Sequence, residues 1–151
     1  MMNKGKTLAV LAVVLVLGLF SSRTLVEGAD WKLCTENPFL KAYYDAGSIT
    51  RPSGDLVRIW VKYTAKGKRG TEFWIHLRKL DKLPTEGYKH FSYHVALYEI
   101  DCGEKMYQRI SGIDFDQEKR MLNYFPPSNW EPIFPESMLE AFYKTTCQKE
   151  K

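Results

Sequence analysis

Three cysteines are the residues of this chain best suited to covalent chemistry: Cys34, Cys102 and Cys147. The export signal predicted for residues 1–28 would carry them into oxidising conditions, so we interpret them as disulfide candidates before metal ligands or nucleophiles. An odd number of thiols leaves one of them unpaired within the chain. Cys34 follows Trp31 and Leu33, and in that apolar setting we expect a buried thiol and not a nucleophile, with pairing to a second chain left open.

The histidines do not have the spacing of a metal site. His90 and His94 lie four residues apart, which suits one metal ion on a helix. In the strand expected there, the same spacing places them about 13 Å apart along one face. His76 stands alone on an expected helix. We therefore predict structural roles for all three and no metal site.

Asp114 and Asp116 are two residues apart and could point to one side of a strand, as an acid and base pair requires. The following Gln117 to Lys119 are typical of a hairpin turn, so we interpret the two aspartates as solvated residues beside that turn. No serine after residue 28 has the Gly-x-Ser-x-Gly context, and there is no glycine-rich phosphate loop and no Cys-x-x-Cys pair. The sequence therefore predicts no catalytic residues and no cofactor.

The first 28 of the 151 residues have the composition of a cleavable secretory signal. Lys4 and Lys6 precede 13 residues, 8–20, in which only Gly18 lacks an apolar side chain. A membrane-spanning helix needs about 20 apolar residues, so this run is too short for a conventional span. Cleavage after Gly28 would release residues 29–151, and an uncleaved short anchor is the alternative. A lipoprotein is not expected, because the first cysteine, Cys34, lies well beyond the apolar run.

Residues 29–151 carry 19 Lys and Arg against 17 Asp and Glu, a net charge of +2. Nucleic-acid binders usually show a much stronger basic excess, because phosphate contacts supply most of their affinity. We therefore expect no nucleic-acid partner. A domain of this size can bury roughly two thirds of its unfolded surface, which is enough for one modest core.

The mature part reads as consecutive strands joined by turns, with two helices. Apolar and polar residues alternate with a period of two over 56–63 and 91–102, and more weakly over 105–115. Shorter strands are predicted at 31–34, 40–45 and 120–125. Thr71 is predicted to cap a short helix, and the spacing after Pro135 predicts a second helix that ends near Cys147. The fold class is therefore α+β: a single antiparallel meander of about five to six strands, with an inserted helix and a C-terminal helix packed on the sheet.

One charged segment stands out at residues 66–89, where seven Lys or Arg face three acidic residues. Such a run usually forms a solvated surface. As a possible partner-binding segment we single out its basic residues Lys66, Lys68, Arg69, Arg78, Lys79 and Lys82.

Several short motifs occur together in an order that resembles the surface-adhesin protein E-like family of bacterial exported proteins. They are Asp30-Trp31, Tyr43-Tyr44-Asp45-Ala46, Ser48-Ile49-Thr50-Arg51, Val57-Arg58-Ile59-Trp60-Val61-Lys62, Ala96-Leu97-Tyr98-Glu99-Ile100-Asp101-Cys102, Trp130-Glu131-Pro132-Ile133, Pro135-Glu136-Ser137 and Cys147. The resemblance implies a small antiparallel sheet backed by a C-terminal helix, and a disulfide between Cys102 and Cys147. In the named adhesin it also implies binding of host extracellular proteins, which we do not carry over to this chain.

Together these observations predict a non-enzymatic binding protein located in the periplasm or outside the cell. Its partner is expected to be a protein or an envelope component, held by a sheet face or edge and by the basic segment. Two alternatives stay open at this point: a small envelope enzyme or enzyme inhibitor, and a carrier for a small apolar ligand, suggested by the 21 aromatic residues.

Overall fold

The structure, a computed structural model, describes residues 28–148, so the predicted signal segment lies outside the described residues except for Gly28. Seven strands form one sheet: β1 (Trp31–Glu36), β2 (Leu40–Asp45), β3 (Leu56–Ala65), β4 (Phe91–Asp101), β5 (Met106–Asp116), β6 (Met121–Phe125) and β7 (Glu131–Pro132). The helices are α2 (Gly67–Leu80) and α3 (Met138–Cys147), with short 3₁₀ turns η1 (Ala46–Ser48) and η2 (Tyr88–His90).

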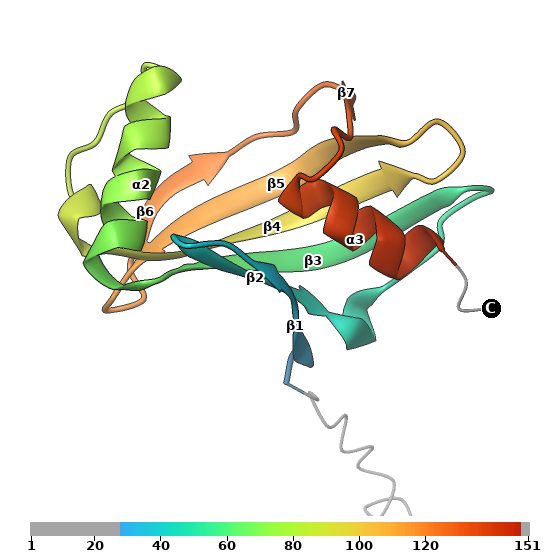
Figure 1. Cartoon of the computed structure of the whole chain (residues 1–151), viewed down its shortest axis with the longest axis horizontal. Coiled ribbons are helices and arrows are strands. Elements are labelled where there is room, and N and C mark those ends of the chain that lie inside the picture. The colour runs from blue at the N-terminus through green and yellow to red at the C-terminus, as the bar shows by residue number, and fades with distance from the viewer. Residues whose placement is uncertain (1–27, 149–151) are drawn as a thin grey trace, which may run out of the picture.

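The sheet is an antiparallel meander in which β1 to β6 pair in sequence order, while β7 pairs with β5 (Figure 1). Both helices lie on the same face of the sheet, with α2 over one end of the strands and α3 further along (Figure 1). These observations confirm the predicted α+β meander with an inserted helix and a C-terminal helix.

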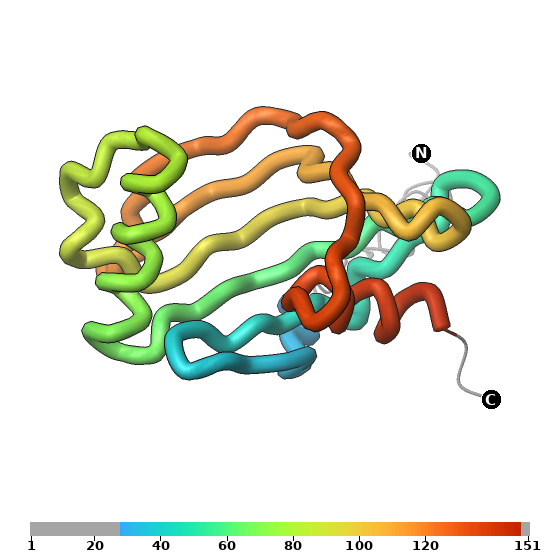
Figure 2. Tube along the Cα trace, turned by 45° about the horizontal axis from the view of Figure 1, so that its top comes forward, coloured from blue at the N-terminus to red at the C-terminus, as the bar shows by residue number. Residues whose placement is uncertain are grey.

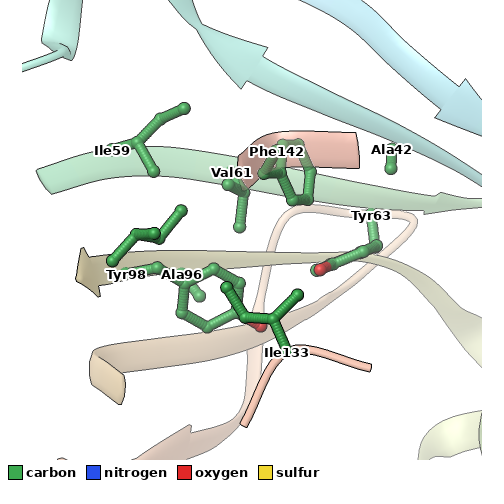
Figure 3. Close-up of a cluster of buried hydrophobic side chains, with 9 residues drawn as sticks. Ala42, Ile59, Val61, Tyr63, Ala96, Tyr98, Ile133 and Phe142 are labelled. Atoms are coloured by element: carbon green, nitrogen blue, oxygen red, sulfur yellow. The ribbon is translucent and has the colours of Figure 1, made fainter. Parts of the chain in front are cut away.

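The core lies between the sheet and α3 (Figure 3). Val57, Ile59 and Val61 alternate along β3 and are fully buried, which follows from the period-two pattern of that strand. The fully buried Phe142 of α3 and the nearly buried Ile133 close the cluster from the other side. Burying an aliphatic or aromatic side chain of this size stabilises a fold by about 1.5–3 kcal/mol.

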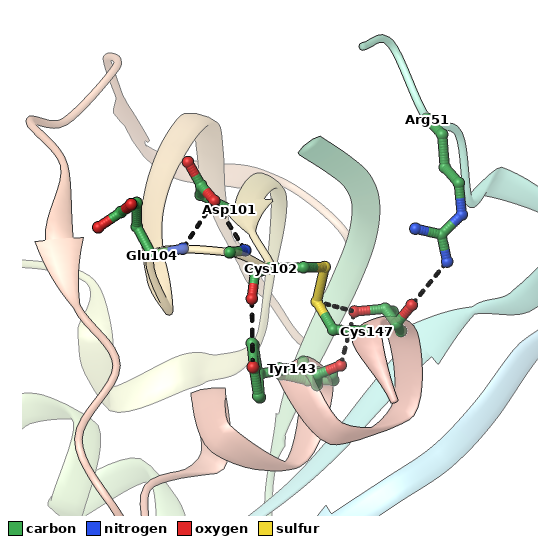
Figure 4. Close-up of a disulfide and its surroundings, with 9 residues drawn as sticks. Arg51, Asp101, Cys102, Glu104, Tyr143 and Cys147 are labelled. Atoms are coloured by element: carbon green, nitrogen blue, oxygen red, sulfur yellow. Dashed lines mark hydrogen bonds between the residues drawn. A yellow bond between two sulfur atoms is a disulfide. The ribbon is translucent and has the colours of Figure 1, made fainter. Parts of the chain in front are cut away.

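Local signals fix the start of α3. Ser137 caps it by accepting a hydrogen bond from the Glu140 backbone N–H, and Ser at this position satisfies a donor that the helix leaves unpaired. At the other end of α3, Cys147 is bonded to Cys102, which lies just after β4 (Figure 4). The Tyr143 hydroxyl donates to the Cys102 carbonyl at 3.3 Å beside this bridge. The disulfide implied by the family resemblance is confirmed.

The inserted helix begins earlier than predicted. It starts at Gly67, and Thr71 lies inside its second turn, where the hydroxyl donates to the Phe91 carbonyl at 3.1 Å. Thr71 therefore fastens α2 to the start of β4 and does not cap the helix. Gly70 allows a similarly close approach: a Cβ there would lie 2.3 Å from the Phe39 carbonyl oxygen.

The proline-rich segment after β6 crosses the helix-covered side of the sheet before it enters α3 (Figure 2). Trp130 of this segment is 38% exposed. The anchor is Ile133, whose backbone N–H donates to the Lys105 carbonyl and whose side chain enters the core.

Candidate functional site

A buried polar cluster lies beneath α2, centred on Asp114 of β5. The Asp114 side chain has no exposed surface, and its Oδ1 accepts from Nδ1 of His94 on β4 at 2.7 Å. Its Oδ2 accepts from the Tyr88 hydroxyl at 2.6 Å and from Nε1 of Trp74 at 3.3 Å. His94 and Asp114 are cross-strand partners in the sheet register, so pairing of β4 with β5 itself brings them together.

Arg78 of α2 balances the charge of Asp114. Its Nη1 lies 3.4 Å from Asp114 Oδ2, its Nε donates to the Pro84 carbonyl, and its guanidinium stacks 3.9 Å from the centre of the Tyr88 ring. Arg78 is only 4% exposed. A buried ion pair is tolerated only when further hydrogen bonds satisfy both groups, and this cluster provides them.

Burial and the hydrogen bond to Asp114 raise the pKa of Tyr88 well above its ordinary value. The Tyr88 hydroxyl therefore keeps its proton and acts as a donor to the carboxylate. Burial likewise raises the pKa of Tyr63 and of Tyr98, which line the space next to the cluster.

That space is a pocket of about 360 Å³ between α2, the sheet and the start of α3. Its apolar walls come from Leu40, Phe73, Trp74, Leu77, Leu83, Phe125 and Met138, and its polar lining from Asn37, Tyr63, Arg78, Asp81, His94, Tyr98 and Arg109. The volume is near the lower end of the range for small-molecule sites, and the lining is more polar than is usual for them.

His94 lines this pocket and has one ring nitrogen without a partner in the described residues. An ionised Asp114 can only accept, so the bond at Nδ1 assigns the proton to that nitrogen and leaves Nε2 as an acceptor in the neutral ring. Nε2 has no hydrogen-bond partner within residues 28–148, and that part of the chain contains no side-chain nitrogen or oxygen that is both fully buried and unpaired. Nε2 is therefore accessible, although the residue as a whole is 95% buried.

A β-bulge brings Arg109 beside His94. Leu97 pairs with Ser111, but the next residue, Tyr98, pairs with Arg109, so Ile110 is the extra residue on β5. The bulge reverses the alternation of β5, and Arg109 therefore lines the pocket on the same face as Gly112. A Cβ at Gly112 would lie 2.9 Å from His94 Cε1 and 3.0 Å from Arg109 Cδ, so the missing side chain makes room for both.

The opposite face of the sheet is a second candidate surface. The register places the partly exposed side chains of Trp31, Leu33, Tyr43, Trp60, Lys62, Tyr93, Val95, Leu97, Ile113, Phe115 and Tyr124 on this side. We call this surface the helix-free face, because neither α2 nor α3 packs on it. Tyr93 and Phe115 stack there at 5.0 Å, and Lys62 Nζ lies 4.5 Å from the centre of the Trp31 ring.

The basic residues of the predicted segment lie in different surroundings. Arg78 is buried against Asp114, so we withdraw it from the partner-binding set. Lys66 pairs with Glu36 and Lys68 with Glu72, while Arg69 lies over the Phe39 ring. The exposed residues Lys79 and Lys82 lie at the end of α2 and just beyond it.

The prediction that Asp114 and Asp116 are solvated is also wrong. Asp114 and Asp116 are buried and not solvated: Asp116 accepts from the backbone N–H groups of Arg120 and Glu118, and the first of these bonds is the main reason why its pKa is lowered. The burial of Asp114 was not predicted, because the hairpin residues that follow it suggested an exposed turn and not a buried position of the alternating strand. Arg109 was missed because its face depends on the bulge.

The remaining predicted residues lie apart from the pocket. His76 and His90 are exposed. Cys34 is half-buried on β1, with Sγ 3.4 Å from the Thr145 hydroxyl, and burial raises the pKa of its thiol. Between residues 28 and 148 the structure shows no trio of His, Cys, Asp or Glu side chains arranged to hold a metal ion.

Two further observations bear on the class of protein. No helix in the described part of the chain has the length and apolar character needed to cross a membrane. Neither a comparison with curated proteins nor one with solved structures returned a significant match.

The family described as Surface-adhesin protein E matches residues 31–148, a range that contains every strand and both α-helices described above. The chain therefore belongs to the surface-adhesin protein E family.

Proposed function

We propose that this chain is an exported, non-enzymatic binding protein of the bacterial cell envelope or exterior, which holds a protein partner on the helix-free face of its sheet. The observation that carries the proposal is the composition of that face. An antiparallel sheet with one side open to water normally places polar residues there. Here aromatic and aliphatic side chains from β1 to β6 occupy much of the open side, beside a few charged residues such as Arg58, Lys62 and Glu99.

The exposure of these side chains supports a docking role. Leu33 is 53% exposed and Tyr124 is 51% exposed, at the two ends of the face. Contiguous exposed apolar area is typical of protein interaction sites, and aromatic residues are enriched in the centres of such interfaces. The face therefore offers the partner anchors that are already held in place by the strands.

The charges on this face favour a partner whose interface is surrounded by acidic residues. Lys62 lies over the rings of Trp31 and Tyr43, and burial lowers its pKa. The Arg58 guanidinium pairs with Glu99, which is itself nearly buried, so most of the carboxylate surface here is hidden. Complementary charge gives orientation and speed of encounter more than affinity.

Export is supported by the disulfide, because such bonds persist mainly in oxidising compartments. The name of the family, a surface adhesin, points the same way. A non-enzymatic role is supported by the lining of the pocket: the His94 and Asp114 pair resembles part of a catalytic triad, but the lining contains no Ser, Thr or Cys that His94 could activate. The exposed Lys79 and Lys82 remain a proposed secondary contact.

Site-specific photo-crosslinking tests the proposal. A photoreactive amino acid at position 97, in the centre of the helix-free face, should give one discrete adduct in intact cells. The matched control carries the same amino acid at position 144, on the exposed side of α3, and should give none. Leu33→Ser combined with Tyr124→Ser should abolish the adduct while leaving the melting temperature nearly unchanged.

The location is tested on the same samples. The protein should be recovered from periplasm or medium with an intact mass two hydrogens below that of the reduced chain. Equal adducts at positions 97 and 144, or recovery of a fully reduced chain from cytosol alone, would overturn the proposal.

A further inference from the structure

The pocket on the helix-covered side of the sheet is separate from the helix-free face, so the partner proposed above does not account for it. Its two arginines, Arg78 and Arg109, are not equally free to bind an anion. The charge of Arg78 is neutralised by Asp114. Four side chains already donate hydrogen bonds to the Asp114 carboxylate, so this carboxylate has little capacity for a further donor. Among residues 28–148, Arg109 forms no ion pair: its Nε donates to the Pro126 carbonyl at 3.2 Å, and its guanidinium lies 5.1 Å from the centre of the Phe125 ring.

The positions of Arg109 and His94 define a polar end for a ligand. Both side chains come within 3.2 Å of the point where a Cβ would lie on Gly112, so they are neighbours. The terminal nitrogens of Arg109 can donate two parallel hydrogen bonds to a carboxylate. His94 borders the same end, with its ring held in orientation by the bond from Nδ1 to Asp114; its Nε2, an acceptor in the neutral ring, leaves the binding of the carboxylate to Arg109.

The rest of the pocket is lined mainly by aromatic and aliphatic side chains. Trp74 and Phe125 flank the His94 ring, with ring centres 5.3 Å and 5.5 Å away, and Leu77 and Met138 add aliphatic walls. Asp81 carries a carboxylate at the exposed C-terminal end of α2, which disfavours a second negative group on the ligand at that rim. The lining therefore matches one anionic group on an otherwise apolar molecule.

We infer that this pocket binds a small aromatic monocarboxylate, with its carboxylate on Arg109 and its ring system against the apolar lining formed by Trp74, Phe125 and the aliphatic wall. The polar end is preorganised, because the Asp114 cluster fixes His94 and the bulge at Ile110 fixes Arg109 before any ligand arrives. Preorganisation lowers the ordering cost of binding.

Calorimetric titration of the purified protein with 2-naphthoate and with the neutral isostere 2-naphthamide tests the inference. Naphthoate should bind at least ten-fold more tightly than the amide. Arg109→Leu should remove that preference and weaken naphthoate at least ten-fold. Arg51→Leu is the matched control, since Arg51 donates to the Thr146 carbonyl at the far end of α3 and is not part of the pocket lining, and it should bind as the wild type does.

NMR of the unaltered protein gives a result that no folding defect of a variant can obscure. Naphthoate should shift the side-chain signals of Arg109, His94 and Trp74 together, with the same saturation curve. Three results would overturn the inference: equal affinity for acid and amide, no shift of the Arg109 signal at millimolar naphthoate, or shifts confined to the helix-free face.

Discussion

Nδ1 of His94 lies 2.7 Å from Oδ1 of Asp114, across the ladder that joins the two longest strands of the sheet. This contact ties the polar cluster to the register of β4 and β5. A shift of one residue in that register would turn one of the two side chains to the other face. The contact therefore links the pairing of the sheet to the geometry of the pocket.

Asp114→Asn should be among the most destabilising single substitutions in the chain. The amide removes the charge that balances Arg78, and breaking a buried ion pair from one side costs about 3–5 kcal/mol. Urea unfolding followed by circular dichroism measures the loss. Asp30→Asn is the matched control, because its pairing with Lys32 is exposed and such pairs contribute at most about 1 kcal/mol. Equal midpoints for the two variants would refute the structural role of the cluster.

Cys102→Ser should lower the free energy of unfolding by about 4 kcal/mol, the loop-entropy value for a bridge that closes a loop of this length. That is a large share of the total stability of a small domain, about 5–15 kcal/mol. Thermal melts under non-reducing conditions give the comparison. Cys34→Ser, which removes the free thiol, should melt close to the wild type, and a reductant should bring the wild type down to the level of Cys102→Ser. A Cys102→Ser protein that melts with the wild type would contradict this expectation.

Gly70→Ala should loosen the attachment of α2 to the sheet. The added methyl would lie 2.3 Å from the Phe39 carbonyl oxygen and 2.9 Å from Ala65 backbone atoms, and backbone cannot yield as a side-chain tip can. We expect a loss of about 1–3 kcal/mol, typical of overpacking. Gly47→Ala meets nothing nearer than 3.6 Å and serves as the control. Hydrogen exchange should show faster opening of α2 in the first variant alone.

Lowering the pH should weaken the attachment of α3, because Glu140 becomes protonated. The Glu136 backbone N–H, then Lys105 and Lys144, hold the pKa of Glu140 at about 2, below its ordinary 4.5. A lowered pKa means that the folded state favours the ionised form, so this contribution is complete above about pH 4.5 and is lost as the pH falls through 2.

Glu140→Gln should therefore be less stable than the wild type at pH 6, and the difference should shrink towards pH 2. Urea midpoints measured at steps between pH 2 and pH 6 test this dependence. Glu72→Gln on α2 controls for the loss of an exposed carboxylate paired with a lysine. A Glu140→Gln difference that is constant over this range would show that the carboxylate contacts do not carry it.

Much of the fold is encoded in short stretches of sequence. The alternation of Val57, Ile59, Val61 and Tyr63 sets both the strand and its buried face, because a period of two leaves no other way to bury those side chains. Pro135 and Ser137 similarly mark the entry to α3. The start of α2 was predicted too late because Thr71 has the chemistry of a cap, and only the neighbouring β4 shows that its hydroxyl is used elsewhere.

The sequence by itself determined the class of fold and the order of the strands, because these depend on residues close together in the chain. It also supplied three cysteines from which one disulfide could form. Tertiary structure alone decided that Asp114 is buried, that Arg78 neutralises it, and that Arg109 joins His94 in a pocket. Those outcomes depend on one strand register, one bulge and the docking of α2. Each of these brings together residues 15 to 36 positions apart, a range over which local propensity carries no information.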